Sequence, residues 1–200
     1  DSVLLGPEKL NRDNIYKTEV SENPKCEMDV VQPAIGLVPN VKIMQHGNEK
    51  EIYRHYKTLI NRVLKSGKSI YLLRHSFEDL EIIKAIKDEF IDDQRVILLE
   101  DDYNCMQIDE LLSKFDFIIA SRYHSIIHAY KNGVPAFVFG WAIKYQELLS
   151  AFFQERYMFD VREDIEEKNI LATIDYMLGH SEEESERINQ KLAEINSDEL

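Results

Sequence analysis

The sequence predicts an α/β fold: a doubly wound, Rossmann-like parallel sheet followed by C-terminal helices. Short apolar runs rich in β-branched residues alternate with segments whose apolar residues recur at three- and four-residue spacing. The connections are short, and polar residues follow each apolar run. Strands that alternate with helices in this way pair in parallel, because each helix crosses back over the sheet before the next strand begins.

The first two strands and their helices fall before residue 91. Residues 34–39 are predicted to form a strand, and Asn48 to cap a helix that ends at Ser66-Gly67. A second strand over 69–73 is followed by a helix over 77–90. The apolar residues that define the buried sides of these helices are Ile52, Tyr56, Leu59, Ile60 and Val63, and then Leu80, Ile82, Ile83 and Ile86.

The second half continues the alternation and gives five predicted strands in all. A strand at 117–119 breaks at Ser121-Arg122, where Ser121 is expected to cap a helix that Gly133 ends. The other predicted elements are strands at 96–99 and 136–139 and helices at 106–115, 144–153, 165–178 and 182–195. The last helix is strongly acidic and is interpreted as a solvated face.

Composition narrows the function. With 200 residues, of which 44% are hydrophobic, the chain is long enough for one globular domain with extensions. A net charge of -13 argues against a nucleic-acid partner. No apolar run reaches the roughly 20 residues of a membrane span. Cys26 and Cys105 have neither disulfide-framework nor metal-motif spacing, which fits a reducing compartment, so the expected location is cytoplasmic.

The expected organisation has three parts. Residues 1–33 show no sustained period and are interpreted as the tail of a missing N-terminal domain or a linker. Residues 34–160 form the Rossmann-like domain that would bind a donor substrate, and 161–200 form the C-terminal helices.

Polar residues follow every predicted strand and should meet at one edge of the sheet, where ligands bind in open α/β folds. They are Asn40 with Gln45-His46-Gly47, Arg74-His75-Ser76, Glu100-Asp101-Asp102, Ser121-Arg122-Tyr123-His124, and Gly140-Trp141 with Lys144. Their cationic members would make a pocket for a small polyanion such as a phosphate ester or a nucleotide. The amides of the helix that follows Ser121, together with Arg122, would hold the anion.

Simpler interpretations stand beside these. Arg122 and His124 would alternatively cap a helix or pair with Glu100 or Asp101. His124 and His128 are spaced as a zinc pair, but without a third ligand a packed or surface His128 is favoured, and no metal site is predicted. The acidic triplet 100–102 is expected to be solvated or to cap a helix. His55 is expected at the surface, and His180 as a C-terminal cap.

The segment from Ser121-Arg122-Tyr123-His124 through Gly133-Val134-Pro135 to Lys144 resembles the C-terminal half of the polysaccharide pyruvyl transferase family. That family shows a Ser-Arg-x-His element at the start of a helix, a Gly-Val-Pro turn, and a Lys after the next strand. Weaker matches are residues 1–5, 35–40 and His75-Ser76.

The resemblance implies a GT-B-like two-domain fold and transfer of a pyruvyl group from phosphoenolpyruvate to a sugar diol, as a ketal, in polysaccharide or exopolysaccharide biosynthesis. It implies no redox cofactor and no metal; the acceptor is a saccharide, either free or lipid-linked. Arg122 would bind the donor and His124 would be the general acid. Ser121, Lys144 and the second-rank candidate His75 would complete the substrate contacts, and a half without its N-terminal domain would bind the donor without turnover.

Two other classes remain open. A GT-B glycosyltransferase or nucleotide-sugar epimerase domain would bind a UDP- or GDP-sugar, but such enzymes place a Glu near the turn after this helix, and here no acid follows Pro135 until Glu147. A non-catalytic remnant that only assembles with partners is the other class. The intact Arg122, His124 and Lys144 argue against it. The sequence predicts neither the acceptor sugar nor the oligomeric state.

Overall fold

The computed structural model describes residues 29–197. Residues 1–28, with Cys26 and most of the predicted N-terminal tail or linker, lie outside the described part, as do residues 198–200. The division at residues 33 and 160 therefore stays a prediction.

The described chain forms a six-stranded parallel sheet in the order β3-β2-β1-β4-β5-β6. The order reverses between β1 and β4, as in doubly wound Rossmann-like folds, which confirms the predicted fold class. The strands are β1 (Ala34–Val38), β2 (Ser69–Leu73), β3 (Val96–Leu99), β4 (Ile118–Ala120), β5 (Ala136–Gly140) and β6 (Met158–Asp160).

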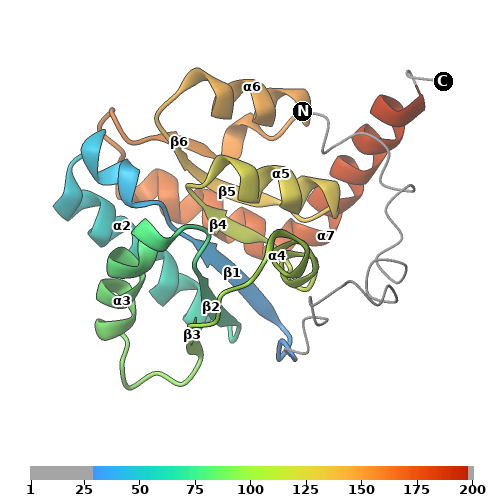
Figure 1. Ribbon diagram of the computed structural model, residues 1–200. Helices are drawn as coiled ribbons and strands as arrows, with labels where there is room; N and C mark the ends of the chain where they lie inside the picture. The colour runs from blue at the N-terminus through green and yellow to red at the C-terminus, as the bar shows by residue number, and fades with distance from the viewer. Residues whose placement is uncertain (1–28, 198–200) are drawn as a thin grey trace.

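Helices cover the sheet on both faces. In Figure 1, α4 and α5 lie in front of the sheet and α7 runs behind it. Helix α2 packs against α7 and β2, and α5 packs against α4, β4 and β5. The helices are α2 (Glu49–Lys65), α3 (Leu80–Asp88), α4 (Cys105–Leu112), α5 (Tyr123–Lys131), α6 (Ile143–Ala151) and α7 (Glu167–Ser197), with short 3-10 turns η3 (Val41–Gln45), η4 (Phe77–Asp79) and η5 (Glu155–Tyr157).

Local sequence signals explain where α2 begins and ends. The Asn48 side chain accepts hydrogen bonds from the amides of Lys50 and Glu51, at 3.0 and 3.3 Å, and so caps the helix as predicted. At the other end Ser66 is the C-cap, and Gly67 adopts a φ of 86°. Gly133 has a φ of 71° just after α5, which confirms its predicted place at that helix end.

Several sequence predictions need correction. The sheet has six strands rather than five, because β6 was not predicted. The two predicted C-terminal helices, in contrast, are confirmed: α7 consists of two helices that meet at a kink at His180 (φ -133°, ψ 18°), between the predicted ends at 178 and 182. The His180 Nδ1 lies 2.9 Å from the Tyr176 carbonyl, at the C-terminal end of the first of them, as predicted. The second half of α7 is not simply a solvated face, because Glu184 is fully buried and receives a hydrogen bond from Gln154.

His55 is also buried, with 3% of its surface exposed, and its ring stacks on Phe139 of β5. The expectation of a surface position was therefore wrong. The predicted helix over 77–90 begins as the 3-10 turn η4, and its α-helical part ends at Asp88. No helix among residues 29–197 is long and apolar enough to cross a membrane.

Candidate functional site

The reversal of strand order brings the ends of β1 and β4 together at the carboxyl edge of the sheet. Asn40 follows β1, and its Nδ2 donates to the carbonyl oxygen of Ser121, which follows β4, at 3.2 Å. The Tyr145 hydroxyl donates to the same carbonyl at 2.9 Å. The carbonyl of Ser121 is therefore held by neighbours from two separate segments of the chain.

Ser121 itself is fully buried. Its Oγ lies 2.7 Å from the hydroxyl of Tyr56 on α2. It does not cap α5: the N-cap residue is Arg122, and no side chain caps that helix. The predicted cap was wrong because the Ser121 hydroxyl forms a hydrogen bond with the buried Tyr56 instead. Ser121 therefore connects the site to the hydrophobic core.

Arg122 is anchored by two carboxylates from η4. Its Nε and Nη2 donate to the two oxygens of Asp79, at 2.8 and 2.6 Å, and Nη2 also donates to Glu78 at 2.7 Å. Asp79 is fully buried and accepts a third hydrogen bond from the Val41 amide at 2.9 Å. The ion-pair partners are thus Asp79 and Glu78, rather than Glu100 or Asp101.

This arrangement determines how Arg122 meets a ligand. Asp79 occupies the guanidinium edge formed by Nε and Nη2, which an incoming carboxylate would otherwise take. The remaining nitrogen, Nη1, contacts no acceptor among residues 29–197. An anion at the site would therefore accept a hydrogen bond from Nη1, while Asp79 and Glu78 hold the guanidinium in position.

His75, from the loop after β2, lies near Arg122 and near two further histidines, His124 and His128. Burial first, and then the nearby His128, Arg122 and His124, lower the pKa of His75 from 6.5 to about 4. His75 is consequently neutral at neutral pH. An anion bound beside it would raise its pKa again.

His128 is packed against other residues, as favoured from the sequence. Its Nδ1 lies 2.9 Å from Oδ1 of the buried Asp109 on α4. Lys131 approaches the other oxygen of Asp109 at 3.7 Å. Within residues 29–197, no three His, Cys, Asp or Glu side chains lie close enough together to hold a metal ion.

The first turn of α5 presents the exposed part of the site. His124 is exposed, and the Tyr123 ring lies edge-on to it at 5.8 Å between centroids. The exposed Lys144 of α6 places its Nζ 4.8 Å from the centroid of Tyr123. The backbone amides of Tyr123 and His124 begin the helix, where no intrahelical acceptor exists. His124, Lys144 and these amides therefore share one neighbourhood.

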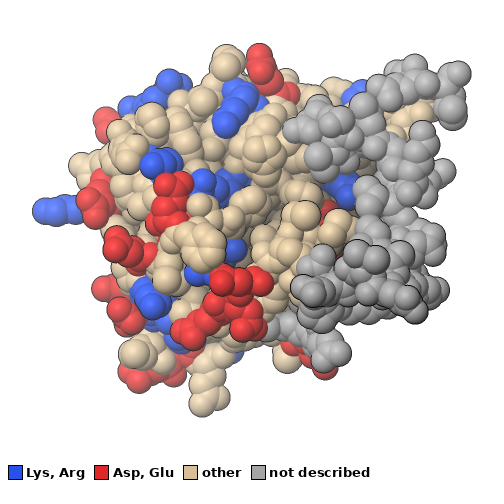
Figure 2. All heavy atoms as spheres, in the orientation of Figure 1, with Lys and Arg blue, Asp and Glu red and all other residues tan. Residues whose placement is uncertain are grey.

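The loops after β2 and β3 pair with one another. Arg74 forms an ion pair with Asp102 and lies 4.6 Å from the centroid of the exposed Phe77 ring. Asp101 accepts from Tyr103 at 3.3 Å. Two acids of the triplet are thus engaged in local contacts. Figure 2 shows basic and acidic side chains interspersed on the face it presents, so no broad basic field covers it.

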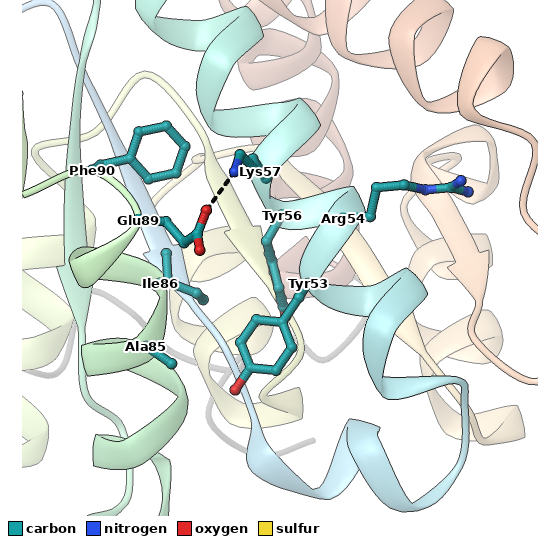
Figure 3. A pocket seen from close by; sticks show the side chains of 8 residues that line it. All are labelled: Tyr53, Arg54, Tyr56, Lys57, Ala85, Ile86, Glu89 and Phe90. Atoms are coloured by element: carbon teal, nitrogen blue, oxygen red, sulfur yellow. Dashed lines mark hydrogen bonds and ion pairs between the residues drawn. The ribbon is translucent and has the colours of Figure 1, made fainter.

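A groove of about 390 Å³ lies between α2 and α3. Figure 3 shows its residues, with the ion pair between Lys57 and Glu89 across it. Its walls come from the first half of α2 and from the end of α3 with the residues just after it, and they include Tyr53, Ile86 and Phe90. Tyr56 lines this groove as well, and its hydroxyl reaches Ser121, so α2 connects the groove to the polar site at the sheet edge.

Sequence reasoning missed two residues that organise the site. Asp79 lies at the end of a short turn and gave no signal of its own. Tyr56 was assigned to the buried side of α2, and its hydroxyl partner is 65 residues away along the chain.

The chain resembles known proteins in sequence and in fold. A family model described as polysaccharide pyruvyl transferase matches residues 10–142. No curated protein matches the chain. Among solved structures, the chain resembles the UDP-GlcNAc 2-epimerase of Methanocaldococcus jannaschii in complex with UDP-GlcNAc and UDP, with a TM-score of 0.55 and 12% identity, covering 86% of this chain and 43% of that one.

Two further structures share the fold. The glycosyltransferase SnogD from Streptomyces nogalater matches with a TM-score of 0.52 and 14% identity, over 88% of this chain and 43% of that one. The C-terminal CMP-Kdo binding domain of WaaA from Acinetobacter baumannii matches with a TM-score of 0.51 and 10% identity, over 93% and 95%. The chain thus spans less than half the length of the first two structures, and at these identities the likeness concerns the fold, which is GT-B-like.

Proposed function

We propose, because this chain belongs to the polysaccharide pyruvyl transferase family, that it binds phosphoenolpyruvate at the carboxyl edge of its sheet and transfers the pyruvyl group to a sugar diol. The family is one of transferases, and the donor, the acceptor and the reaction at this site are our proposal. The observation that carries it is the position of the family's Ser-Arg-x-His element. In this fold it places Arg122 and His124 at the start of α5, beside Lys144.

The donor carries a phosphate and a carboxylate, so its site needs fixed positive charge and hydrogen-bond donors. Lys144 and the amides of Tyr123 and His124 would hold the phosphate. Arg122 would offer Nη1 to the carboxylate while Asp79 fixes the guanidinium. Ser121 would act indirectly, by positioning the strand end next to Arg122.

The reaction adds two hydroxyls of one sugar to the enol carbon of phosphoenolpyruvate. The methylene carbon takes up one proton and becomes a methyl group. The two hydroxyls lose two protons in forming two C–O bonds, the C–O bond to phosphate breaks, and the second proton leaves with the phosphate. The products are the ketal and inorganic phosphate, so the balance needs no redox cofactor and no metal.

His124 is our candidate for the acid that delivers the proton, because it is exposed at the helix start and free to approach a ligand. His75 is neutral in the free protein, and an anion bound beside it would raise its pKa, so that more of it is protonated and able to donate a proton. It would therefore contact the donor and assist His124. The acceptor saccharide, free or lipid-linked, and the cytoplasmic location belong to the same proposal.

A second candidate function follows from the fold alone. Two of the similar structures are a UDP-GlcNAc 2-epimerase and a glycosyltransferase, and a nucleotide diphosphate would suit the same helix start. The segment after Pro135 is the buried strand β5, and it carries no acid that would hold a ribose. That absence favours pyruvyl transfer.

Calorimetric titration with phosphoenolpyruvate, UDP and GDP distinguishes the two candidates. The informative variants are Lys144→Gln and His124→Gln, because both side chains are exposed. Removing Arg122 would instead leave the buried Asp79 carboxylate without its ion-pair partner and would destabilise the fold. Lys57→Gln, in the groove between α2 and α3, is the matched control. We expect phosphoenolpyruvate alone to bind, about tenfold more weakly in Lys144→Gln. Binding of UDP or GDP instead would support the second candidate.

A further inference from the structure

A second pocket, of about 290 Å³, opens at the same edge of the sheet but beside β6. Its walls come from the first turns of α2 and from the segment between β6 and α7. Gly47 joins these walls, because a Cβ at that position would lie 2.5 Å from the Val161 carbonyl oxygen. The lining residues that matter here are His55, Glu51, Arg54, Glu163, Asp164 and Glu166.

His55 is the unusual member. It is 3% exposed, yet its Nδ1 has no hydrogen-bond partner. Its other ring nitrogen also bonds to none of the residues from 29 to 197. Burial, and then the neighbouring Arg54, lower the pKa of His55, so the ring is neutral and can offer one N–H and one lone pair. A buried imidazole without partners costs folding stability, which suggests a role outside folding.

The charge of the pocket decides which ligands it admits. Its lining has four carboxylates and only one guanidinium, which pairs with Glu51. This arrangement repels phosphates and carboxylates, so the donor of the proposed reaction would be excluded. Carboxylates accept strong hydrogen bonds from neutral hydroxyls, and a neutral imidazole both donates and accepts. A ligand with adjacent hydroxyl groups could therefore donate hydrogen bonds to the carboxylates and both donate to and accept from the imidazole.

Aromatic side chains connect this pocket to the proposed donor site. His46, just before Gly47, stacks on Trp141 at 5.0 Å between centroids, and Trp141 lies 5.1 Å from Tyr145. Tyr145 in turn lies 5.7 Å from Tyr123, whose ring Lys144 approaches. Tyr145 is buried, so it supports Trp141 from below, whereas His46 is exposed and Trp141 half-buried, and these two rings offer apolar surface to the C–H faces of sugar rings.

We propose that the pocket around His55 is a saccharide subsite, which binds the hydroxyl groups of a sugar unit through its carboxylates and the neutral imidazole. The inference rests on the proposed function, because a pyruvyl acceptor is a saccharide and this pocket opens at the same edge of the sheet as the proposed donor site. A free sugar and a unit of a longer saccharide offer the same hydroxyls. The stacked His46–Trp141 pair beside the pocket predicts that longer saccharides bind more tightly.

The test uses ligand-observed NMR titration with the methyl glycosides of glucose, galactose, mannose and N-acetylglucosamine, and with maltotriose and chitotriose. Trp141 is the one tryptophan in the sequence, so its fluorescence reports contact at the His46–Trp141 pair. The pocket variants are His55→Phe, which keeps the stacking on Phe139, and Glu163→Gln with Asp164→Asn. Glu186→Gln, an exposed acid elsewhere on α7, is the control.

We expect at least one methyl glycoside to bind with a dissociation constant of about 1 mM, and binding to weaken about tenfold in both pocket variants but not in the control. The proposal is overturned if none of these saccharides binds, or if both pocket variants bind as the parent does. Phosphoenolpyruvate titrated into the same samples separates the two proposals. Donor binding without sugar binding rejects only the subsite, and sugar binding without donor binding rejects only pyruvyl transfer.

Discussion

Asp79 holds Arg122 through two hydrogen bonds, from Nη2 at 2.6 Å and from Nε at 2.8 Å, and the carboxylate is completely buried. Arg122, which the sequence predicts to bind a ligand, therefore also forms an ion pair that holds the fold together. The pair joins η4, which precedes α3, to the start of α5, and the Val41 amide adds the end of β1. Three of the loops at the sheet edge depend on this one carboxylate.

Asp79→Ala should consequently destabilise the protein strongly, because it leaves Arg122 without its buried partner. We expect a loss of about 3–5 kcal/mol in the free energy of unfolding, measured by urea denaturation. Glu78→Gln removes the exposed partner of the same arginine and should change stability little. Equal losses in the two variants would contradict the assignment of Asp79 as the anchor.

The Ser121–Tyr56 pair predicts a non-additive result. Ser121→Ala and Tyr56→Phe should each cost about 1–3 kcal/mol, because each leaves one buried hydroxyl unsatisfied. The double variant removes both hydroxyls and should cost little more than either single change. The measurement is a double-mutant cycle by chemical denaturation. Additive losses would mean that the two hydroxyls act separately.

How far the sequence predicted the fold depended on how local the signals were. The bounds of α2 were predicted correctly because Asn48 and Ser66-Gly67 mark the ends within one turn. β6 was missed because three residues, Met158–Asp160, are too few to show a period. His55 carried a usable signal: it lies three residues after Ile52 and four before Leu59, on the same buried stripe of α2.

The sequence predicted where the candidate site lies in the fold, but not which residues hold its side chains in position. Topology alone puts the ends of parallel strands at one edge, so the neighbourhood of Arg122, His124 and His75 followed from the order of elements. The partner of Arg122 is 43 residues distant along the chain, and no local pattern couples η4 to α5. Such pairings depend on how the loops pack in three dimensions.

His75 predicts a pH dependence of stability. Its pKa is lowered from 6.5 to about 4 in the folded protein, so between these values the unfolded chain takes up a proton that the folded protein does not. The free energy of unfolding should therefore fall as the pH drops from about 6.5 towards 4, by at most about 3 kcal/mol from this residue. Urea denaturation of the parent and of His75→Gln across this range measures it. The same pH slope in both would exclude His75 as the source.

Gly47→Ala should disturb the contact between the start of α2 and the segment after β6. The new Cβ would meet the Val161 carbonyl oxygen at 2.5 Å, and backbone atoms cannot yield as a flexible side chain would. We expect a loss of about 1–3 kcal/mol on denaturation. Gly179→Ala in α7 is the control: it has no neighbour within 4 Å and should stabilise the helix by up to about 1 kcal/mol. Gains in both variants would contradict a tight contact at Gly47.

His55→Phe should stabilise the protein, although His55 is among its most buried polar residues. The variant removes an unpartnered nitrogen from the interior and keeps an aromatic ring against Phe139, so a gain of about 1 kcal/mol is expected at neutral pH. The gain should increase below about pH 6.5, because the lowered pKa makes the parent lose stability as the unfolded chain takes up a proton.

Urea denaturation of both proteins at about pH 7.5 and pH 5.5 measures this difference, and His75 contributes equally to both. A loss of stability in His55→Phe at both pH values would mean that the imidazole has a partner within the fold. A gain, together with weaker saccharide binding by the same variant, would mean that the chain retains His55 at the expense of stability because its imidazole binds a ligand.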